Sequence, residues 1–325
     1  MELRTLRRAE REPLLDLLDD WQMPDGWQGR DFFRRYVEDD PTFLDENVWV
    51  AVEAGRLVSC VQIFPRSLRI CGTAVPAGGI GSVFTRPEHR RSGVAGALLD
   101  HAVEAMSRSG LEISLLFAAR IAWYTRLGWR SWVVLRTLLE RRDPAPPTTG
   151  VEILPFESVR DLAAVKAIYQ SYSGSLDGTV VRDESLWTAS LANAGNPEED
   201  FRVARGGGEV LAYARSTILG GFPILTEFGH GADGAAALAD LLAAMVDGHA
   251  VAGNLHLDPE LERALDDRGF TRQKVEDPTG MLRCIDAAAL AERLGVELPG
   301  GGDPGSLLAA VLPAESFGFW TADRF

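Results

Sequence analysis

The sequence predicts an α/β (α+β) protein made of two tandem mixed-sheet units and a short C-terminal extension. Three observations lead to this expectation. A strand pattern at residues 80–85 runs through a basic turn into a helical apolar pattern from Val94 to Met106. A Pro-rich tract at residues 143–150 then interrupts the chain, and the elements after it repeat the order of those before it. The length of 325 residues also exceeds the usual size of one domain.

The first unit is expected to span residues 1–142. Alternation of apolar and polar residues predicts its early strands, and a period near 3.6 predicts its helices. Prolines and glycines mark the turns between them. The expected strands lie at residues 2–6, 48–53, 56–64, 67–70, 80–85, 113–117 and, closing the sheet, 133–140; the expected helices lie at residues 10–21, 31–37, 94–106 and 119–126.

The second unit is expected to span residues 151–279, after the linker at 143–150, with a remnant domain and tail at residues 280–325. Expected strands lie at residues 151–154, 201–204, 209–217, 224–228 and 253–257, and expected helices at 159–172, 183–194 and 234–247. The corner before the last helix, residues 229–234, has no arginine and carries Asp233, which would repel a phosphate. We therefore expect the second unit to bind no CoA and to serve as scaffold and pocket wall.

The net charge of −14 is unevenly distributed. Residues 1–50 carry a balance of −6, residues 51–150 a balance of +6, and residues 151–325 the remaining −14. An acidic surface repels nucleic acid, so no nucleic-acid partner is expected. The acidic excess either concentrates cationic amines or only keeps the protein dispersed, and the sequence leaves both interpretations open.

The remaining composition indicates a cytoplasmic protein. The first fifteen residues contain no apolar stretch of the signal-peptide kind, and no run of eighteen apolar residues occurs, so no membrane partner is expected. The three cysteines have neither disulfide-framework nor metal spacing, so no metal is expected.

The turn between the strand at 80–85 and the following helix has the chemistry of an anion site. The first N–H groups of a helix lack intrahelical acceptors, and the helix dipole places partial positive charge there. Arg90 and Arg91 add two permanent charges, and Gly93 allows the backbone to come close to a ligand. A diphosphate fits such a corner. The segment is neither a P-loop nor Gly-x-Gly-x-x-Gly.

The segment Arg90-x-x-Gly93-x-Ala95 resembles the acyl-CoA pyrophosphate loop of the GNAT N-acetyltransferases. The segment Tyr124 to Trp129, about thirty residues later, resembles the Tyr-x-x-x-Gly-aromatic part of that superfamily's last motif. The resemblance implies acetyl-CoA as co-substrate and a primary amine, on a small molecule or a peptide, as acceptor. The residues it assigns to acetyl-CoA are Ser82, Val83, Phe84, Arg90, Arg91, Ser92, Gly93, Val94 and Ala95.

The whole chain resembles the Eis (enhanced intracellular survival) type of acetyltransferase, which places one intact and one degenerate GNAT module in tandem. The resemblance implies that Tyr124 and the C-terminal carboxylate of Phe325 are catalytic. The family's sterol-carrier-like third domain is too large for the residues between 287 and 312, which leaves the oligomeric state open, with a homo-oligomer as one option. Acceptor contacts are expected from the first helix pair, at Trp21, Asp25, Trp27 and Phe33, although aromatic packing alone would also explain these side chains.

Two other functions remain open at this stage. The chain could be a non-catalytic acyl-CoA-binding sensor or scaffold that kept the anion corner without turnover. It could also transfer an acyl group longer than acetyl, which depends on a pocket depth that sequence does not give.

Overall fold

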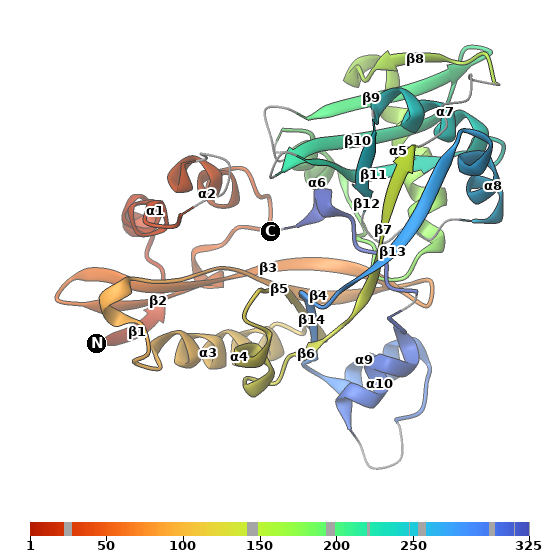
Figure 1. The fold of residues 1–325 in the computed structure, drawn as a ribbon. Helices are drawn as coiled ribbons and strands as arrows, with labels where there is room; N and C mark the ends of the chain where they lie inside the picture. Colours follow the sequence, from red (N-terminus) through yellow and green to blue (C-terminus); the bar gives the residue numbers. More distant parts are fainter. Residues whose placement is uncertain are drawn as a thin grey trace.

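The computed structural model describes residues 1–22, 28–141, 149–192, 199–219, 222–246, 248–252, 258–298, 303–314 and 316–324. Two mixed seven-stranded sheets with helices on their faces dominate these residues (Figure 1). The predicted α/β class with two mixed sheets is therefore confirmed.

The first sheet has helices on both faces. In Figure 1, α1 (Arg11–Asp19) and α2 (Gly29–Glu38) lie above it, and α3 (Val94–Arg108) and α4 (Ile121–Arg126) lie below it. All its ladders are antiparallel except that between β4 and β5. The strands in spatial order are β1 (Glu2–Thr5), β2 (Val48–Glu53), β3 (Arg56–Ile70), β4 (Thr73–Thr85), β5 (Ile113–Phe117), β14 (Gly280–Cys284) and β6 (Arg130–Ser131).

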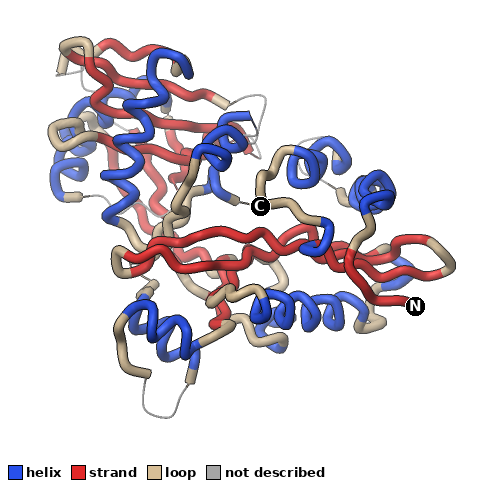
Figure 2. Tube along the Cα trace, turned by 180° about the vertical axis from the view of Figure 1, so that it is seen from behind, coloured by secondary structure: helices blue, strands red, loops and turns tan. Residues whose placement is uncertain are grey.

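The two strands expected at 56–64 and 67–70 form one long strand, β3. Pro65, which the sequence suggests as a break, pairs with Gly78 inside the ladder between β3 and β4. This long hairpin extends from the first unit toward the second sheet, as Figure 2 shows from behind.

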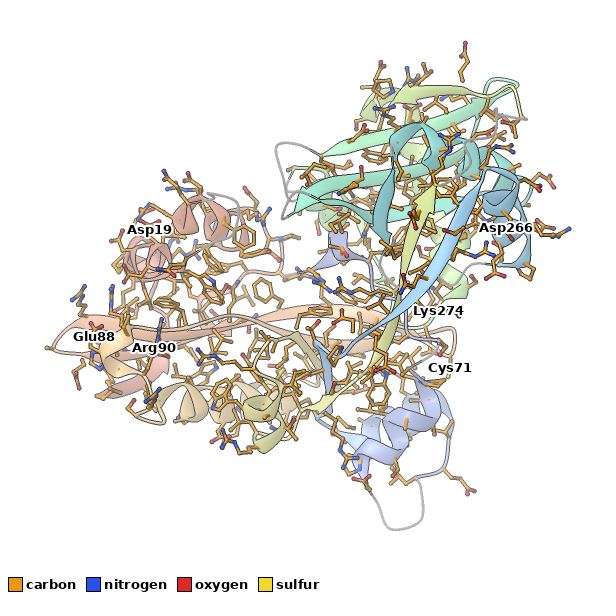
Figure 3. The ribbon with its side chains drawn as sticks, in the orientation of Figure 1. Asp19, Cys71, Glu88, Arg90, Asp266 and Lys274 are labelled. Atoms are coloured by element: carbon orange, nitrogen blue, oxygen red, sulfur yellow. The ribbon has the colours of Figure 1, made fainter. Side chains whose placement is uncertain are left out.

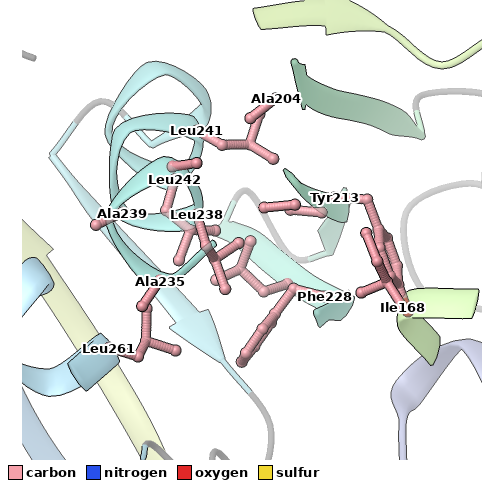
Figure 4. Close-up of a cluster of buried hydrophobic side chains, with 14 of the residues drawn as sticks. Ile168, Ala204, Tyr213, Phe228, Ala235, Leu238, Ala239, Leu241, Leu242 and Leu261 are labelled. Atoms are coloured by element: carbon pink, nitrogen blue, oxygen red, sulfur yellow. The ribbon is translucent and has the colours of Figure 1, made fainter. Parts of the chain in front are cut away.

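The second sheet and a long helix, α7 (Ala235–Met245), together form an apolar core. Side chains of α7, among them Leu238 and Leu242, lie in this core with Phe228 of the sheet, and Tyr213 lies beside Ile168 (Figure 4). The other helices are α5 (Ser158–Tyr172), α6 (Glu184–Ala192) and α8 (Pro259–Asp267). The strands in spatial order are β13 (Phe270–Asp277), β7 (Val134–Arg141), β12 (His249–Ala252), β11 (Phe222–His230), β10 (Glu209–Leu219), β9 (Asp200–Gly206) and β8 (Glu152–Pro155). The strand expected at residues 253–257 lies outside the described residues.

The two sheets exchange strands. The strand expected at 133–140 as the last of the first sheet is β7, and this expectation was wrong, because β7 lies in the second sheet. It pairs along its whole length with β13, from Val134 opposite Asp277 to Arg141 opposite Phe270. In return, β14 joins the first sheet between β5 and β6. Sequence patterning did not indicate β13, whose neighbours are distant in the chain.

The C-terminal part ends in two short helices and a tail. The helices α9 (Ala287–Leu294) and α10 (Pro304–Val311) pack with β14 and the end of the β3–β4 hairpin around Leu290, Leu307 and Leu308. The tail then returns between the two sheets (Figure 1). In the described residues, no helix has the length and apolarity needed to cross a membrane.

A core substitution on β14 tests the strand exchange. Met281 is 1% exposed and packs with Leu98, Leu116 and Trp129 of the first unit. We expect Met281→Ala to lower the free energy of unfolding by about 2–5 kcal/mol, because it deletes buried methylenes and leaves a cavity. Urea denaturation followed by circular dichroism measures this. Val159→Ala, at a fully exposed position, is the control. A loss as small as that of the control would contradict the placement of β14 in the first core.

Candidate active site

The candidate site begins where β4 and β5 separate. The two strands pair in parallel over Ala77–Gly79 and Ile113–Leu115. After these three pairs β4 continues to Thr85 and β5 to Phe117, but the two strands no longer pair with each other. The main-chain groups along the facing edges therefore remain available to a ligand, because an unpaired strand edge presents free N–H and C=O groups.

A β-bulge marks the β4 side of this opening. Gln62 pairs with Gly81 and Cys60 with Phe84, so Ser82 and Val83 together lie opposite one residue of β3. Ser82 has a φ of +49°, and its hydroxyl donates a hydrogen bond to the Gln62 side-chain oxygen at 3.1 Å. A bulge redirects the side chains and main chain next to it. The predicted residues Ser82, Val83 and Phe84 thus lie at an irregular strand edge beside the opening.

The basic corner follows at the end of β4. Arg90, Arg91, Ser92 and Gly93 are exposed, and Gly93 is the residue before α3, with a φ of +85°. The Arg90 Nε donates to the Thr85 carbonyl at 3.1 Å, which holds that side chain along the end of the strand. Figure 3 shows Glu88 and Arg90 at this end of the sheet, far from Cys71 at the hairpin turn. Val94 is buried and Ala95 is half-buried in the first turn of α3.

Tyr124 lies on the α3 face of the sheet, beside the end of β5. It packs in one cluster with Leu116, and its ring meets that of Trp129 edge-on at 6.1 Å. Burial raises the pKa of its phenol to about 12, against a smaller opposing effect of the Arg120 charge. The phenol is therefore neutral across the physiological range of pH.

The exchanged strand holds the Tyr124 helix in place. Arg283 of β14 donates from Nη1 to the Leu127 carbonyl at the end of α4, and its guanidinium lies 5.0 Å from the centre of the Trp129 ring. Sequence analysis did not find this contact, because it joins residues more than 150 positions apart.

The tail lies on the opposite face of β5. The Phe319 ring is 5.3 Å from that of Phe117, and the Arg324 guanidinium lies 4.2 Å above the Phe117 ring. Leu116 and Phe117 point to opposite faces, since side chains alternate along a strand. Tyr124 and the tail therefore flank the same end of β5 from two sides. Phe325, whose carboxylate is predicted to be catalytic, lies outside the described residues.

The second unit anchors the tail. The Trp320 Nε1 donates to the Ser173 hydroxyl at 2.9 Å, and the Trp320 ring lies 5.0 Å from that of Phe228. The Asp323 carboxylate accepts from the Arg182 Nε at 2.8 Å. The side chains of Arg182 and Asp323 are 1% and 8% exposed, so this ion pair is buried.

The Arg182 side chain joins two buried acids. It pairs with Asp323 of the tail and with Glu227 of β11, and Glu227 also accepts from the Tyr213 hydroxyl at 2.9 Å. Burial raises the pKa of Asp323, and the charge of Arg182 offsets part of that increase. Burial also acts to raise the pKa of Glu227, but the charges of Arg182 and Arg215 outweigh it and lower that pKa.

The four residues predicted to contact the acceptor do not share one environment. Trp21 is half-buried and lies 5.3 Å from Phe33 and 5.7 Å from Phe84, measured between ring centres. Phe33 is 4% exposed and packs in the core of the helix pair. Asp25 and Trp27 lie outside the described residues. Sequence analysis overlooked Tyr36, one turn beyond Phe33, whose ring lies 5.4 Å from that of Phe64 on β3.

No group of three or more His, Cys, Asp or Glu side chains could hold a metal ion in the part of the chain that the structure describes.

Comparison with known proteins agrees with the fold and with the nature of the first unit. Residues 2–131 match the family model of an acetyltransferase (GNAT) domain. The chain is also similar in structure to three longer proteins. A GCN5-related N-acetyltransferase from Anabaena variabilis has a TM-score of 0.70 at 16% identity, over 90% of this chain and 74% of that one. A probable N-acyltransferase from Enterococcus faecalis has a TM-score of 0.71 at 17% identity, over 90% of this chain and 74% of that one. Eis1 from Mycobacterium abscessus has a TM-score of 0.61 at 18% identity, over 90% of this chain and 76% of that one. No curated protein matches the sequence.

Loss of the cation that anchors the tail should be costly. Arg182→Met leaves Asp323 and Glu227 buried without their shared partner, so we expect a decrease of about 3–5 kcal/mol in the free energy of unfolding. Arg202→Met is the matched control, because Arg202 pairs with Asp200 and both side chains are more than a third exposed. The control should cost less than about 1 kcal/mol. An equal decrease in the free energy of unfolding for both variants, measured by urea denaturation, would contradict this expectation.

Proposed function

We propose that this chain is an N-acetyltransferase of the Eis type, which transfers acetyl from acetyl-CoA to a primary amine by direct attack. The observation that carries the proposal is the opening between β4 and β5, with Tyr124 on one face of the β5 end and the tail on the other. The match of residues 2–131 to an acetyltransferase (GNAT) domain and the likeness to N-acetyltransferase structures support it.

The acetyl-CoA diphosphate would bind at the corner between β4 and α3. The N–H groups of the first turn of α3 and the charges of Arg90 and Arg91 suit two phosphates. The pantetheine arm would then follow the unpaired edge of β4 past Val83 and Ser82. A strand edge can hydrogen-bond such an amide-containing chain as it would another strand.

The units divide the work in this proposal. The catalytic unit is residues 1–142 without β7, which lies in the second sheet, and it is completed by β14. Residues 151–279 form a degenerate module that supports the tail. A Cβ added to Gly234 at the start of α7 would lie 2.2 Å from the Leu211 carbonyl oxygen, so that strand-to-helix corner is tightly packed against main chain. Together with Asp233 this argues against a second CoA site. Residues 280–325 are the remnant domain and tail.

The reaction forms one C–N bond and breaks one C–S bond. The neutral amine attacks the thioester carbonyl carbon, the CoA thiolate leaves, and the amine nitrogen loses one proton to a base. We assign that base to the C-terminal carboxylate of Phe325. The placement of Arg324 over Phe117 supports this assignment, because it puts the preceding residue beside the end of β5.

Tyr124 stabilises the leaving group in this scheme. Its pKa of about 12 lies about 3.5 units above that of a thiol near 8.5, so complete proton transfer to the thiolate would be uphill by about 5 kcal/mol. The phenol can instead donate a hydrogen bond to the sulfur as negative charge develops there, which lowers the barrier without a separate protonation step.

Thiol release from acetyl-CoA, measured with a panel of polyamines, aminoglycosides, amino acids and lysine peptides, tests the function. Turnover with at least one amine supports the enzyme. Tight binding of CoA by calorimetry without turnover on any amine would instead favour the acyl-CoA sensor.

Removal of the Tyr124 hydroxyl should slow acyl transfer. We expect Tyr124→Phe to reduce kcat by about a hundredfold or more, comparable to loss of one oxyanion-hole donor, with little change in the KM for acetyl-CoA. The wild-type rate should also not fall between pH 8 and about pH 10 through ionisation of this phenol, since its raised pKa keeps the proton in place. Thr188→Val is the control, because that hydroxyl is exposed and bonds to the Glu184 carbonyl within α6 of the second unit. A kcat within threefold of wild type would remove Tyr124 from the mechanism.

A further inference from the structure

Arg324 occupies an unusual position for a charged side chain. The central carbon of its guanidinium lies 4.2 Å from the centre of the Phe117 ring, and its Nε is completely covered and has no hydrogen-bond partner among the described residues. The residue as a whole keeps partial exposure. Burial, with the nearby Arg136 charge, lowers the pKa of Arg324 to about 10, and Asp277 and Tyr36 oppose this only in part.

The acids nearest to Arg324 are engaged with other groups. One oxygen of Asp277 accepts from Arg136, and the other accepts from the main-chain N–H and the hydroxyl of Thr279 at 3.0 and 2.6 Å. The adjacent residue Asp323 points away and pairs with Arg182 in the second unit. Both carboxylates therefore have partners that already occupy them.

A largely covered guanidinium without an anion is costly. The contact with the Phe117 ring offsets about 0.5–2 kcal/mol of the desolvation. It does not engage the N–H donors at the edge of the guanidinium plane, and Nε has no hydrogen-bond partner among the described residues. Those donors form a planar fork that matches the two oxygens of a carboxylate. Among the described residues, the arrangement thus lacks one component, an anion that pairs with the Arg324 guanidinium.

In the proposed function, the acceptor would approach the opening at this place in the fold. Arg324 lies over Phe117 at the end of β5, beside the opening, and Tyr36 of α2 is among the groups that influence its pKa. The corner at Arg90 lies at the end of β4, before α3, where the diphosphate of acetyl-CoA would bind. An anion at Arg324 therefore belongs to the acceptor and not to the diphosphate.

We propose that Arg324 is a specificity-determining residue that binds a carboxylate of the acceptor, so that the preferred substrates are amines that also carry a carboxylate group. This deepens the proposed function and rests on it. Electrostatic pairing with Arg324 orients the acceptor so that its amine, at the other end, points toward the thioester. The acidic surface of the protein is then no guide to the acceptor, because the charge that the acceptor meets at this point is positive.

Matched acceptor pairs test the proposal. Glycine, β-alanine and lysine are each compared with the corresponding carboxamide. The value of kcat/KM is calculated from the concentration of unprotonated amine, because the amine of the carboxamide has a lower pKa than the amine of the amino acid. We expect the carboxylate member of at least one pair to be preferred by about tenfold or more, as for one charge-assisted hydrogen-bonded pair. The spacing of amine and carboxylate in the preferred pair reports how far Arg324 lies from the thioester.

Variants identify the residue responsible. Arg324→Gln should reduce the preference ratio of that pair to about one, and Arg324→Lys should keep part of it, because the charge remains without the planar fork. Arg202→Gln, at the surface pair with Asp200, should leave the ratio as in wild type. A wild-type ratio near one overturns the proposal. An equal loss on acid and amide in Arg324→Gln also overturns it, because Arg324 would then act on the protein's own terminal carboxylate.

A binding measurement separates this proposal from the proposed enzyme. Calorimetry compares N-acetyl-lysine with its amide on the CoA-saturated protein, without turnover. Tighter binding of the acid, lost in Arg324→Gln, supports the carboxylate subsite even if no amine releases thiol, in which case only the enzyme assignment fails. Equal binding of both compounds counts against the subsite.

Discussion

The exchange of β7 and β14 between the two sheets is the constraint on which the arrangement of the site depends. β14 forms five register pairs with β5 and so fixes the strand whose end borders the opening. The same strand delivers Arg283 to the end of α4, and α4 carries Tyr124. A segment that follows the whole second unit in the chain therefore helps to position the phenol of the first. Because the contacts are backbone ladders and buried side chains, the two units cannot separate without loss of both sheets.

The distribution of charge follows the same organisation. The protein is strongly acidic, yet Arg136, Arg182 and Arg324 lie where the two units and the tail meet. Arg182 is paired with two buried acids, Arg136 is paired with Asp277, and Arg324 lacks a carboxylate partner in the described part of the chain. Buried charges of this kind add little to stability when paired and cost much when left alone. Their retention at one place is more readily explained by positioning and recognition than by stability.

The fold class and the anion corner could be predicted from sequence because both depend on local signals. Alternation, helical period, Gly93 and the Arg90–Arg91 pair act within a few residues of each other, and the strands and helices of the first unit follow them closely. The pairing of β7 could not be predicted in this way. Its apolar pattern fits either sheet, and the choice is decided by its neighbours β13 and β12, which lie more than 100 residues away in sequence. For the same reason the sequence indicated Tyr124 but not Arg283, and the aromatic tail but not its ion pair with Arg182.

The short segment between β14 and the tail also has a structural explanation. Cys284, at the end of β14, and Phe317, near the start of the tail, pack in the same apolar cluster with α9 and α10. The chain thus leaves this cluster and returns to it, and the residues between need only connect two neighbouring points. The entropy of closing such a loop depends weakly on its length, so a large domain or a small one can be accommodated there. The placement of the tail is determined by contacts on either side of that interval, at Ser173, Arg182 and Phe117, and these contacts do not require a third domain.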